Sequence, residues 1–169
     1  MRFIKLFFIS VIVLGSLLTA LSLLLPPHLH IARNITISAT DEKMFSVIND
    51  LHTWNSWNKI VSDSTLTNIK ISADGHSATS DQLDVFLQKD SIGGITIFWK
   101  QHNGKQFNGG FKLMHLTDDS ATTTVQWYFD FTFKWYPWEK FSSLVYDKQF
   151  QPLMEVSLNN LKQQVENNP

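Results

Sequence analysis

The stretch VQWYFDFTFKW, residues 125–135, decides the fold of this chain. Every odd position in it carries a large apolar side chain, and the even positions between them are polar or amphipathic. Because successive side chains of a strand point to opposite faces, this alternation predicts one long antiparallel strand with one wet face. Five of the six inner residues are aromatic. So large a ring surface must be covered, either by a long helix or by a bound apolar ligand.

A helix that could cover the rings follows in the sequence. Up to this point apolar residues recur every second residue, but after Pro137 they recur about every 3.6 residues. This change predicts a long amphipathic helix to the end of the chain. We expect a kink at Pro152, since a proline cannot donate to the carbonyl of Lys148. The expected apolar stripe comprises Phe141, Leu144, Val145, Leu153, Met154, Leu158, Leu161 and Val165.

Before the ring-bearing strand the sequence predicts one strand and one or two short helices. Alternation over residues 31–38 indicates the strand, with Arg33 as a polar exception on its apolar face. Thr40 is a suitable N-cap for the first helix, because two acidic residues follow it in the first turn. The segment 52–58 then carries two tryptophans, and we expect it to close one end of the sheet or to act as a lid.

Hairpins fill the middle of the chain. Alternating segments between Leu66 and Trp135 predict about five strands in succession. The dipeptides Asp74-Gly75 and Asn103-Gly104 separate two of the pairs, and both tolerate the positive backbone angles that tight hairpin turns require.

Composition restricts the class of function. The 169 residues carry a formal net charge of −1 without a basic run, which argues against nucleic acid as a partner. The absence of cysteine excludes disulfides, thiolate metal sites and a cysteine nucleophile. The six histidines lack the paired spacing of a metal-binding helix, so we expect no metal and no other cofactor.

Residues 1–27 form a separate segment, and residues 28–169 form the domain. Residues 6–25 lack charge, and as a helix they would be about 30 Å long, enough to cross a bilayer. A cleaved signal peptide is the alternative, but its apolar core is usually only about 7 to 15 residues. We therefore expect an uncleaved single-pass anchor. Arg2 and Lys5 precede it, which predicts a cytoplasmic N-terminus and a domain on the extracytoplasmic, periplasmic side.

Two parts of the chain resemble a known superfamily. The first is the run from Ile37 to Phe45, ISATDEKMF, together with Ile48, Asp50, Trp54 and Trp57. The second is in the C-terminal helix and comprises Phe141, Leu144, Asp147, Lys148, Pro152, Glu155, Leu158, Leu161 and Lys162. Both are similar to the START-like (SRPBCC) superfamily of polyketide cyclase/dehydrase and lipid-transport domains.

The resemblance implies an α+β helix-grip fold, in which a curved antiparallel sheet wraps a long C-terminal helix and leaves a cavity between them. Here one transmembrane helix would precede it. The chain departs from the family at Thr40, where a proline is common, and in a glycine-rich strand that is reduced to Gly93-Gly94, with Gly109-Gly110 later. The family has no universal catalytic set, so the resemblance implies no catalytic residue.

Candidate ligand-binding residues come from the predicted ring face, the segment 52–58 and the C-terminal helix. For each of them the alternative is ordinary core packing. Tyr146 is the candidate that would offer a hydroxyl to a ligand. The candidates are Trp54, Trp57, Trp99, Phe111, Trp127, Phe129, Tyr146, Phe150 and Met154.

Three functions compete at this point. We favour a membrane-tethered module that binds a small hydrophobic or lipid-like ligand between the sheet and the C-terminal helix. A cyclase or dehydratase acting on an apolar substrate is the alternative, with Tyr146, His115 or Arg33 orienting the substrate. A ligand-free interaction domain is the third, and a cavity well below about 300 Å³ would favour it. The sequence determines neither the ligand nor the oligomeric state.

Overall fold

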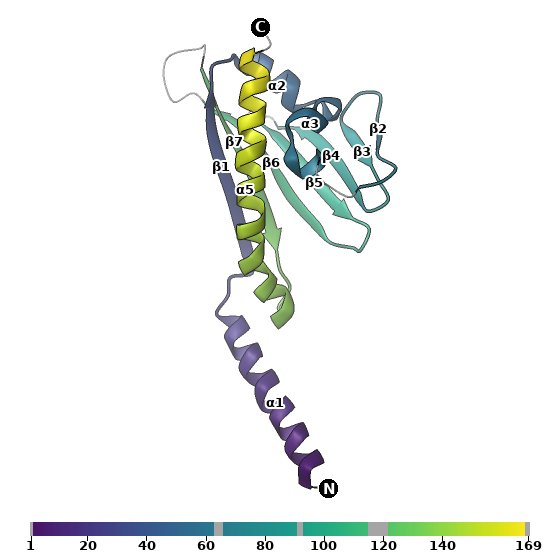
Figure 1. The fold of residues 1–169 in the computed structure, drawn as a ribbon, viewed down its shortest axis with the longest axis vertical. Coiled ribbons are helices and arrows are strands. Elements are labelled where there is room, and N and C mark those ends of the chain that lie inside the picture. Colours follow the sequence, from purple (N-terminus) through teal and green to yellow (C-terminus); the bar gives the residue numbers. More distant parts are fainter. Residues whose placement is uncertain (1, 63–65, 91–92, 115–121, 168–169) are drawn as a thin grey trace.

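The computed structural model describes residues 2–62, 66–90, 93–114 and 122–167. These residues form a seven-stranded antiparallel sheet in the order β1-β7-β6-β5-β4-β3-β2, with a long helix along one face (Figure 1). The strands are β1 (His28–Ile37), β2 (Lys70–Ile71), β3 (Ser77–Thr79), β4 (Leu83–Lys89), β5 (Ile95–Gln101), β6 (Gln106–Met114) and β7 (Thr123–Thr132). The helices are α1 (Arg2–Leu23), α2 (Asp41–Ile48), α3 (Leu51–Trp57), α4 (Lys59–Ser62) and α5 (Pro137–Asn167). The predicted α+β helix-grip fold is confirmed.

Strand β7 has the predicted two faces. Its odd-numbered residues from Val125 to Phe131 are buried, whereas Asp130 and Thr132 on the other face are exposed. The prediction was wrong at the C-terminal end, because β7 stops at Thr132 and Trp135 is 64% exposed. The neighbouring strand β1 begins at His28, directly opposite Thr132, so the ladder between the two strands extends no further.

The described residues contain six strands after the short helices, where about five were expected. The additional strand is β3, which pairs with β2 and β4 over three residues or fewer in each case. Its sequence, Ser-Ala-Thr, lacks the apolar alternation by which a strand is recognised. Both predicted turns are present, with positive φ angles at Gly75 and Gly104.

Helix α5 is one helix of 31 residues that continues through Pro152. The C-terminal part of its predicted stripe is buried, namely Met154, Leu158, Leu161 and Val165. The prediction was wrong for Leu144 and Val145, which are 54% and 49% exposed. The same turns of α5 bury Ser143 and pack Tyr146 on Phe131, so Leu144 and Val145 lie on the helix face that points away from the sheet. The first turns of α5 lie beside the end of α1 (Figure 1).

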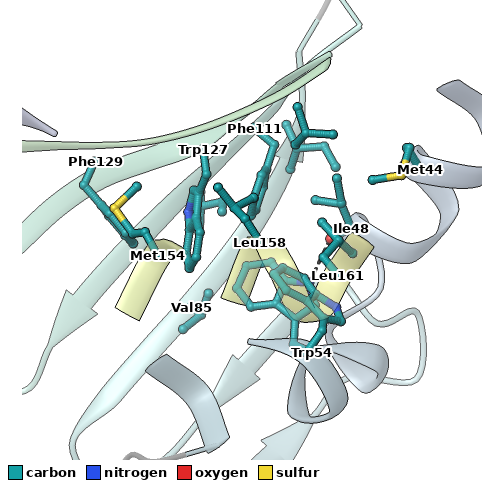
Figure 2. Packing of buried hydrophobic residues seen from close by; sticks show 14 of the residues in the cluster. Met44, Ile48, Trp54, Val85, Phe111, Trp127, Phe129, Met154, Leu158 and Leu161 are labelled. Atoms are coloured by element: carbon teal, nitrogen blue, oxygen red, sulfur yellow. Dashed lines mark hydrogen bonds between the residues drawn. The ribbon is translucent and has the colours of Figure 1, made fainter. Parts of the chain in front are cut away.

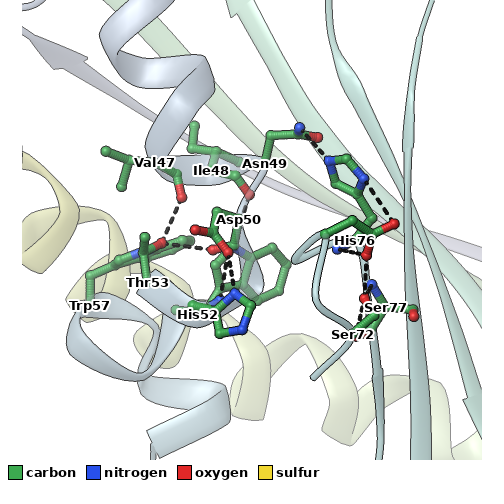
Figure 3. Close-up of polar contacts among 12 residues, drawn as sticks. Val47, Ile48, Asn49, Asp50, His52, Thr53, Trp57, Ser72, His76 and Ser77 are labelled. Atoms are coloured by element: carbon green, nitrogen blue, oxygen red, sulfur yellow. Dashed lines mark hydrogen bonds and ion pairs between the residues drawn. The ribbon is translucent and has the colours of Figure 1, made fainter. Parts of the chain in front are cut away.

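The tryptophan segment forms helix α3, which polar contacts hold in place (Figure 3). Asp50 caps α3, since its Oδ1 accepts a hydrogen bond of 2.9 Å from the backbone N–H of His52. The backbone N–H of Leu51 donates to the carbonyl of Gly75 in the β2–β3 turn at 2.9 Å. A Cβ at Gly75 would overlap the Asp50 carboxylate, so only glycine fits this turn. These contacts fix α3, and with it Trp54, against the hairpin.

Helix α1 contains the apolar segment Phe3–Leu23, which is long enough to cross a membrane and is almost entirely exposed. A signal sequence has the same properties, so the helix is a candidate membrane span. Two hydrogen bonds join the end of this segment to the domain. Lys140 Nζ donates to the Leu25 carbonyl at 2.6 Å, and the backbone N–H of Phe133 donates to the Pro27 carbonyl at 2.8 Å.

We predict that Leu158→Ala lowers the free energy of unfolding by about 2–5 kcal/mol, since it opens a cavity under the sheet. Val156→Ala is the matched control on the same helix, and because Val156 is 45% exposed we expect a change within about 0.5 kcal/mol. Urea unfolding followed by tryptophan fluorescence measures both. Equal effects of the two substitutions would contradict the packing described for α5.

A second prediction concerns Asp50. Burial raises the pKa of Asp50, but the hydrogen bonds from the backbone and ring of His52 outweigh it, so the pKa lies below its usual value. A lowered pKa means that the charged carboxylate stabilises the fold above the unfolded pKa of about 4, and that this contribution is lost as pH falls. Asp50→Asn should therefore be less stable than the native chain at about pH 7, with the difference shrinking by about pH 3. Unfolding titrations at both pH values would show a constant difference if the carboxylate charge had no role.

Candidate ligand-binding site

Side chains fill the middle of the space between the sheet and α5 (Figure 2). The Trp127 ring stacks on Phe111 with centroids 5.2 Å apart and meets Trp57 of α3 at 6.2 Å. Phe129 meets Phe150 of α5 at 5.3 Å. Trp127 and Phe129 are at most 1% exposed. Rings from α3, α5 and the sheet therefore cover the aromatic face of β7, and the remaining space lies on either side of this cluster.

A small cavity lies on one side, under α3 and α4. Its volume is about 140 Å³, and its wall is almost entirely apolar. Trp54 and Trp99 line it together with side chains from β2, β3 and β4. Typical sites for small molecules measure about 300–1,000 Å³, so this cavity is small for a drug-sized ligand.

A larger groove lies on the other side, at the N-terminal half of α5. Its volume is about 580 Å³, within the usual range for a ligand site. Its walls come from the β5–β6 hairpin, the end of β7, the segment that follows and α5. Five rings form an apolar floor, namely Phe107, Phe131, Phe133, Tyr146 and Phe150. Polar residues and one glycine complete the lining: Gln101, Asn103, Gly104, Lys105, Gln106, Thr132, Lys134, Glu139 and Gln149.

The floor of the groove is held by contacts among its own rings. Phe131 is the centre, with ring centroids 5.0 Å from Phe107, 5.1 Å from Tyr146 and 5.2 Å from Phe150. On the rim, Glu139 Oε2 accepts a hydrogen bond of 2.8 Å from the backbone N–H of Lys134. The groove is thus preformed, with an apolar base and charged groups of both signs at its edge.

The structure divides the sequence-predicted residues among three places. Tyr146 and Phe150 line the groove, and Trp54 and Trp99 line the small cavity. The other five line neither space and are buried in the ring cluster, namely Trp57, Phe111, Trp127, Phe129 and Met154. A role in ligand binding for these nine residues stays a prediction.

Sequence reasoning did not select Phe107, Phe131 and Phe133 for the site. The alternation along residues 125–135 places the last two on the inner face, so this sequence signal could have found them. It could not show that Trp127 lies in a closed cluster while Phe131 and Phe133 line the base of a groove.

The polar groups considered for catalysis are also separated. Tyr146 lines the groove, whereas Arg33 Nε donates to Glu155 Oε1 at 2.9 Å and lines neither space. His115 lies outside the described residues. Within the part of the chain that the structure describes, no group of three His, Asp or Glu side chains is arranged to hold a metal ion.

Comparisons with known proteins agree with this architecture. The chain is similar to a START superfamily protein from Mycobacterium smegmatis, with 15% identity and a TM-score of 0.58 over 83% of this chain and 99% of that one. It is also similar to the Zhui aromatase/cyclase from a Streptomyces species, with 14% identity and a TM-score of 0.56 over 83% and 94%. XoxI from Bacillus cereus gives 14% identity and a TM-score of 0.57 over 80% and 94%. At these identities the likeness shows a shared fold.

No curated protein matches the chain. The family model for polyketide cyclase / dehydrase and lipid transport matches residues 28–166, which is all of the sheet and nearly all of α5. The chain therefore belongs to the polyketide cyclase / dehydrase and lipid transport family.

Proposed function

We propose that this protein is a membrane-tethered module that binds a lipid-like ligand in the groove between the end of β7 and α5. The observation that carries the proposal is the groove itself, with a volume of about 580 Å³, an apolar floor and a polar rim. The family supports a ligand-binding or cyclase-type module.

The lining favours an amphipathic ligand over a purely apolar one. Burial of hydrocarbon against the five rings of the floor contributes about 25 cal/mol per Å² of apolar surface. A polar head group would meet Lys105, Lys134 and Gln149 at the rim. These side chains offer N–H donors, which suit the oxygen atoms of an ester, a carboxylate or a phosphate.

The groove also argues against the third alternative, a ligand-free interaction domain. A filled core was the expectation for that alternative, and the ring cluster around Trp127 is indeed filled. However, the groove beside it exceeds the volume of about 300 Å³ below which a ligand is disfavoured. Of the floor rings, Phe107, Tyr146 and Phe150 are partly exposed, whereas Phe131 and Phe133 are buried.

Helix α1 supports the tether. It has the length and apolarity of a membrane span, and Arg2 and Lys5 at its start favour a cytoplasmic N-terminus. Residues 1–27 would then anchor the chain, and residues 28–169 would lie on the extracytoplasmic, periplasmic side. In this arrangement the domain stays beside the bilayer, where lipid-like molecules are concentrated.

A cyclase-type enzyme is a second candidate function, favoured by the position of Tyr146 in the groove. A phenol hydroxyl beside a bound apolar substrate could donate or accept a proton. Arg33 does not support this candidate, because it is engaged with Glu155 away from the groove.

We predict that native mass spectrometry of the full chain, purified from membranes in a mild detergent, detects one bound lipid-like molecule. Gln149→Trp should lower the bound fraction about tenfold, because the new ring would occupy the groove from an exposed position on α5. Asn159→Trp is the matched control, since Asn159 is exposed on the same helix and lines no pocket described above. Equal occupancy in both variants would contradict binding in the groove.

The variant Tyr146→Phe separates binding from turnover within the same experiment. A binding module should retain a molecule of the same mass, since only one hydroxyl is lost. An enzyme that uses the Tyr146 hydroxyl should instead accumulate its unconverted substrate, with a different mass.

We also predict that α1 is retained in the mature protein. The intact mass of the membrane-purified chain should include residues 1–27, and the protein should stay with the membrane on alkaline extraction. A C-terminal reporter should be active only on the extracytoplasmic side, in line with the positive-inside tendency. A mature chain that begins near Leu25, or a cytoplasmic reporter signal, would contradict the proposed topology.

A further inference from the structure

Three aromatic rings lie in contact with one another where α5 begins. Tyr136 lies between two tryptophans, with its centroid 4.9 Å from Trp135 and 5.0 Å from Trp138. The rings of Tyr136 and Trp138 are parallel within 3°. Trp135 is 64% exposed and Trp138 is 70% exposed. We call these three residues the juxtamembrane ring patch.

The patch is held close to the end of the apolar helix α1. On one side of it Phe133 donates its backbone N–H to Pro27, and on the other Lys140 donates through Nζ to the carbonyl of Leu25. Lys140 is only 7% exposed, so the second contact is shielded from water. Figure 1 shows the first turns of α5 beside the last turns of α1. The patch and residues 24–27 therefore occupy the same level along the long axis of the molecule.

Exposed rings at this level match the chemistry of a membrane interface. The apolar segment Phe3–Leu23 is about 30 Å long, the thickness of a bilayer core, so a spanning α1 ends among the lipid head groups. Tryptophan and tyrosine are enriched at this depth, where an apolar ring and a polar N–H or O–H are both satisfied. Val145 lies about two helical turns after Trp138 on the same face of α5. It is 49% exposed and extends the apolar surface.

We propose that the juxtamembrane ring patch docks into the head-group layer of the bilayer that α1 crosses and sets the mouth of the groove against the lipid. This inference rests on the proposed tether. The groove and the patch share one segment of chain, because Lys134 and Glu139 line the groove and directly flank Trp135 and Trp138. Docking of the rings therefore brings the edge of the groove formed by Lys134 and Glu139 to the bilayer surface. A lipid-like ligand could then enter the groove without crossing water.

The charged residues beside the patch do not favour binding by attraction to charged lipid head groups. The rings are therefore the expected source of membrane binding. Lys134 and Glu139 have opposite signs, and the segment between them carries no other charge. Docking should therefore occur on electrically neutral phosphatidylcholine and should not depend on salt, unlike that of a polybasic surface.

The test uses the full chain reconstituted in phosphatidylcholine vesicles, with and without lipids brominated near the ester groups. Bromine quenches only nearby rings, so Trp135 and Trp138 should lose fluorescence in the brominated vesicles, whereas tryptophans of the buried cluster should not. The double variant Trp135→Phe/Trp138→Phe should abolish the quenching. As a matched control, Phe98→Trp in that background adds a tryptophan at a 39% exposed position on β5, and it should not restore quenching.

An alkaline wash of the same vesicles separates the two proposals. Quenching of the native chain that disappears in the double variant, in protein that the wash does not remove, supports docking. Protein that stays in the vesicles but fluoresces equally in both lipids overturns docking and leaves the tether intact. Protein that the wash removes overturns the tether, and docking with it. Quenching restored by Phe98→Trp also overturns docking, because the whole domain would then lie in the lipid.

Discussion

The packing of rings on the inner face of β7 against α3 and α5 is the contact on which the rest of the structure depends. Trp127, Phe129 and Phe111 come from two neighbouring strands, and Trp57 of α3 meets Trp127 and Phe111. Each ring buries a large apolar area and makes many dispersion contacts. Because the sheet, the short helices and α5 all contribute to this cluster, it joins elements that are distant in the sequence.

The same cluster determines where space remains between the sheet and α5. Its rings occupy the centre of the space between the sheet and α5, where the helix-grip fold leads one to expect a cavity. Among the described residues, a cavity of about 140 Å³ lies under α3 and α4, and a groove of about 580 Å³ lies at the start of α5. Only the second has both the size and the mixed lining that suit an amphipathic molecule.

The start of α5 combines three features that have separate origins in the sequence. It supplies Tyr146 and Phe150 to the groove, and Lys140 donates to the carbonyl of Leu25, two residues after α1. It also carries Trp138 of the juxtamembrane ring patch. Leu144 and Val145 fit the apolar stripe of a long helix, yet they are exposed here because they lie on the face of α5 that points away from the sheet. These exposed side chains leave apolar surface near the end of α1.

Sequence patterns determined the order of the elements, the two faces of β7, the long C-terminal helix, the cap at Thr40 and the separate apolar segment at the N-terminus. The resemblance to a known family implied the helix-grip arrangement. These features are local, since side-chain direction follows from the repeat of a strand or a helix and from the chemistry of a cap. The end of β7 at Thr132, the short strand β3 and the exposure of Trp135 were decided by tertiary structure, because each depends on where a neighbouring strand or helix stops. The division of the candidate residues between a closed cluster, a cavity and a groove was decided in the same way. Ring spacing along one strand predicts which side chains face inward, but only the packing of α3 and α5 on that face determines which of them remain accessible to a ligand.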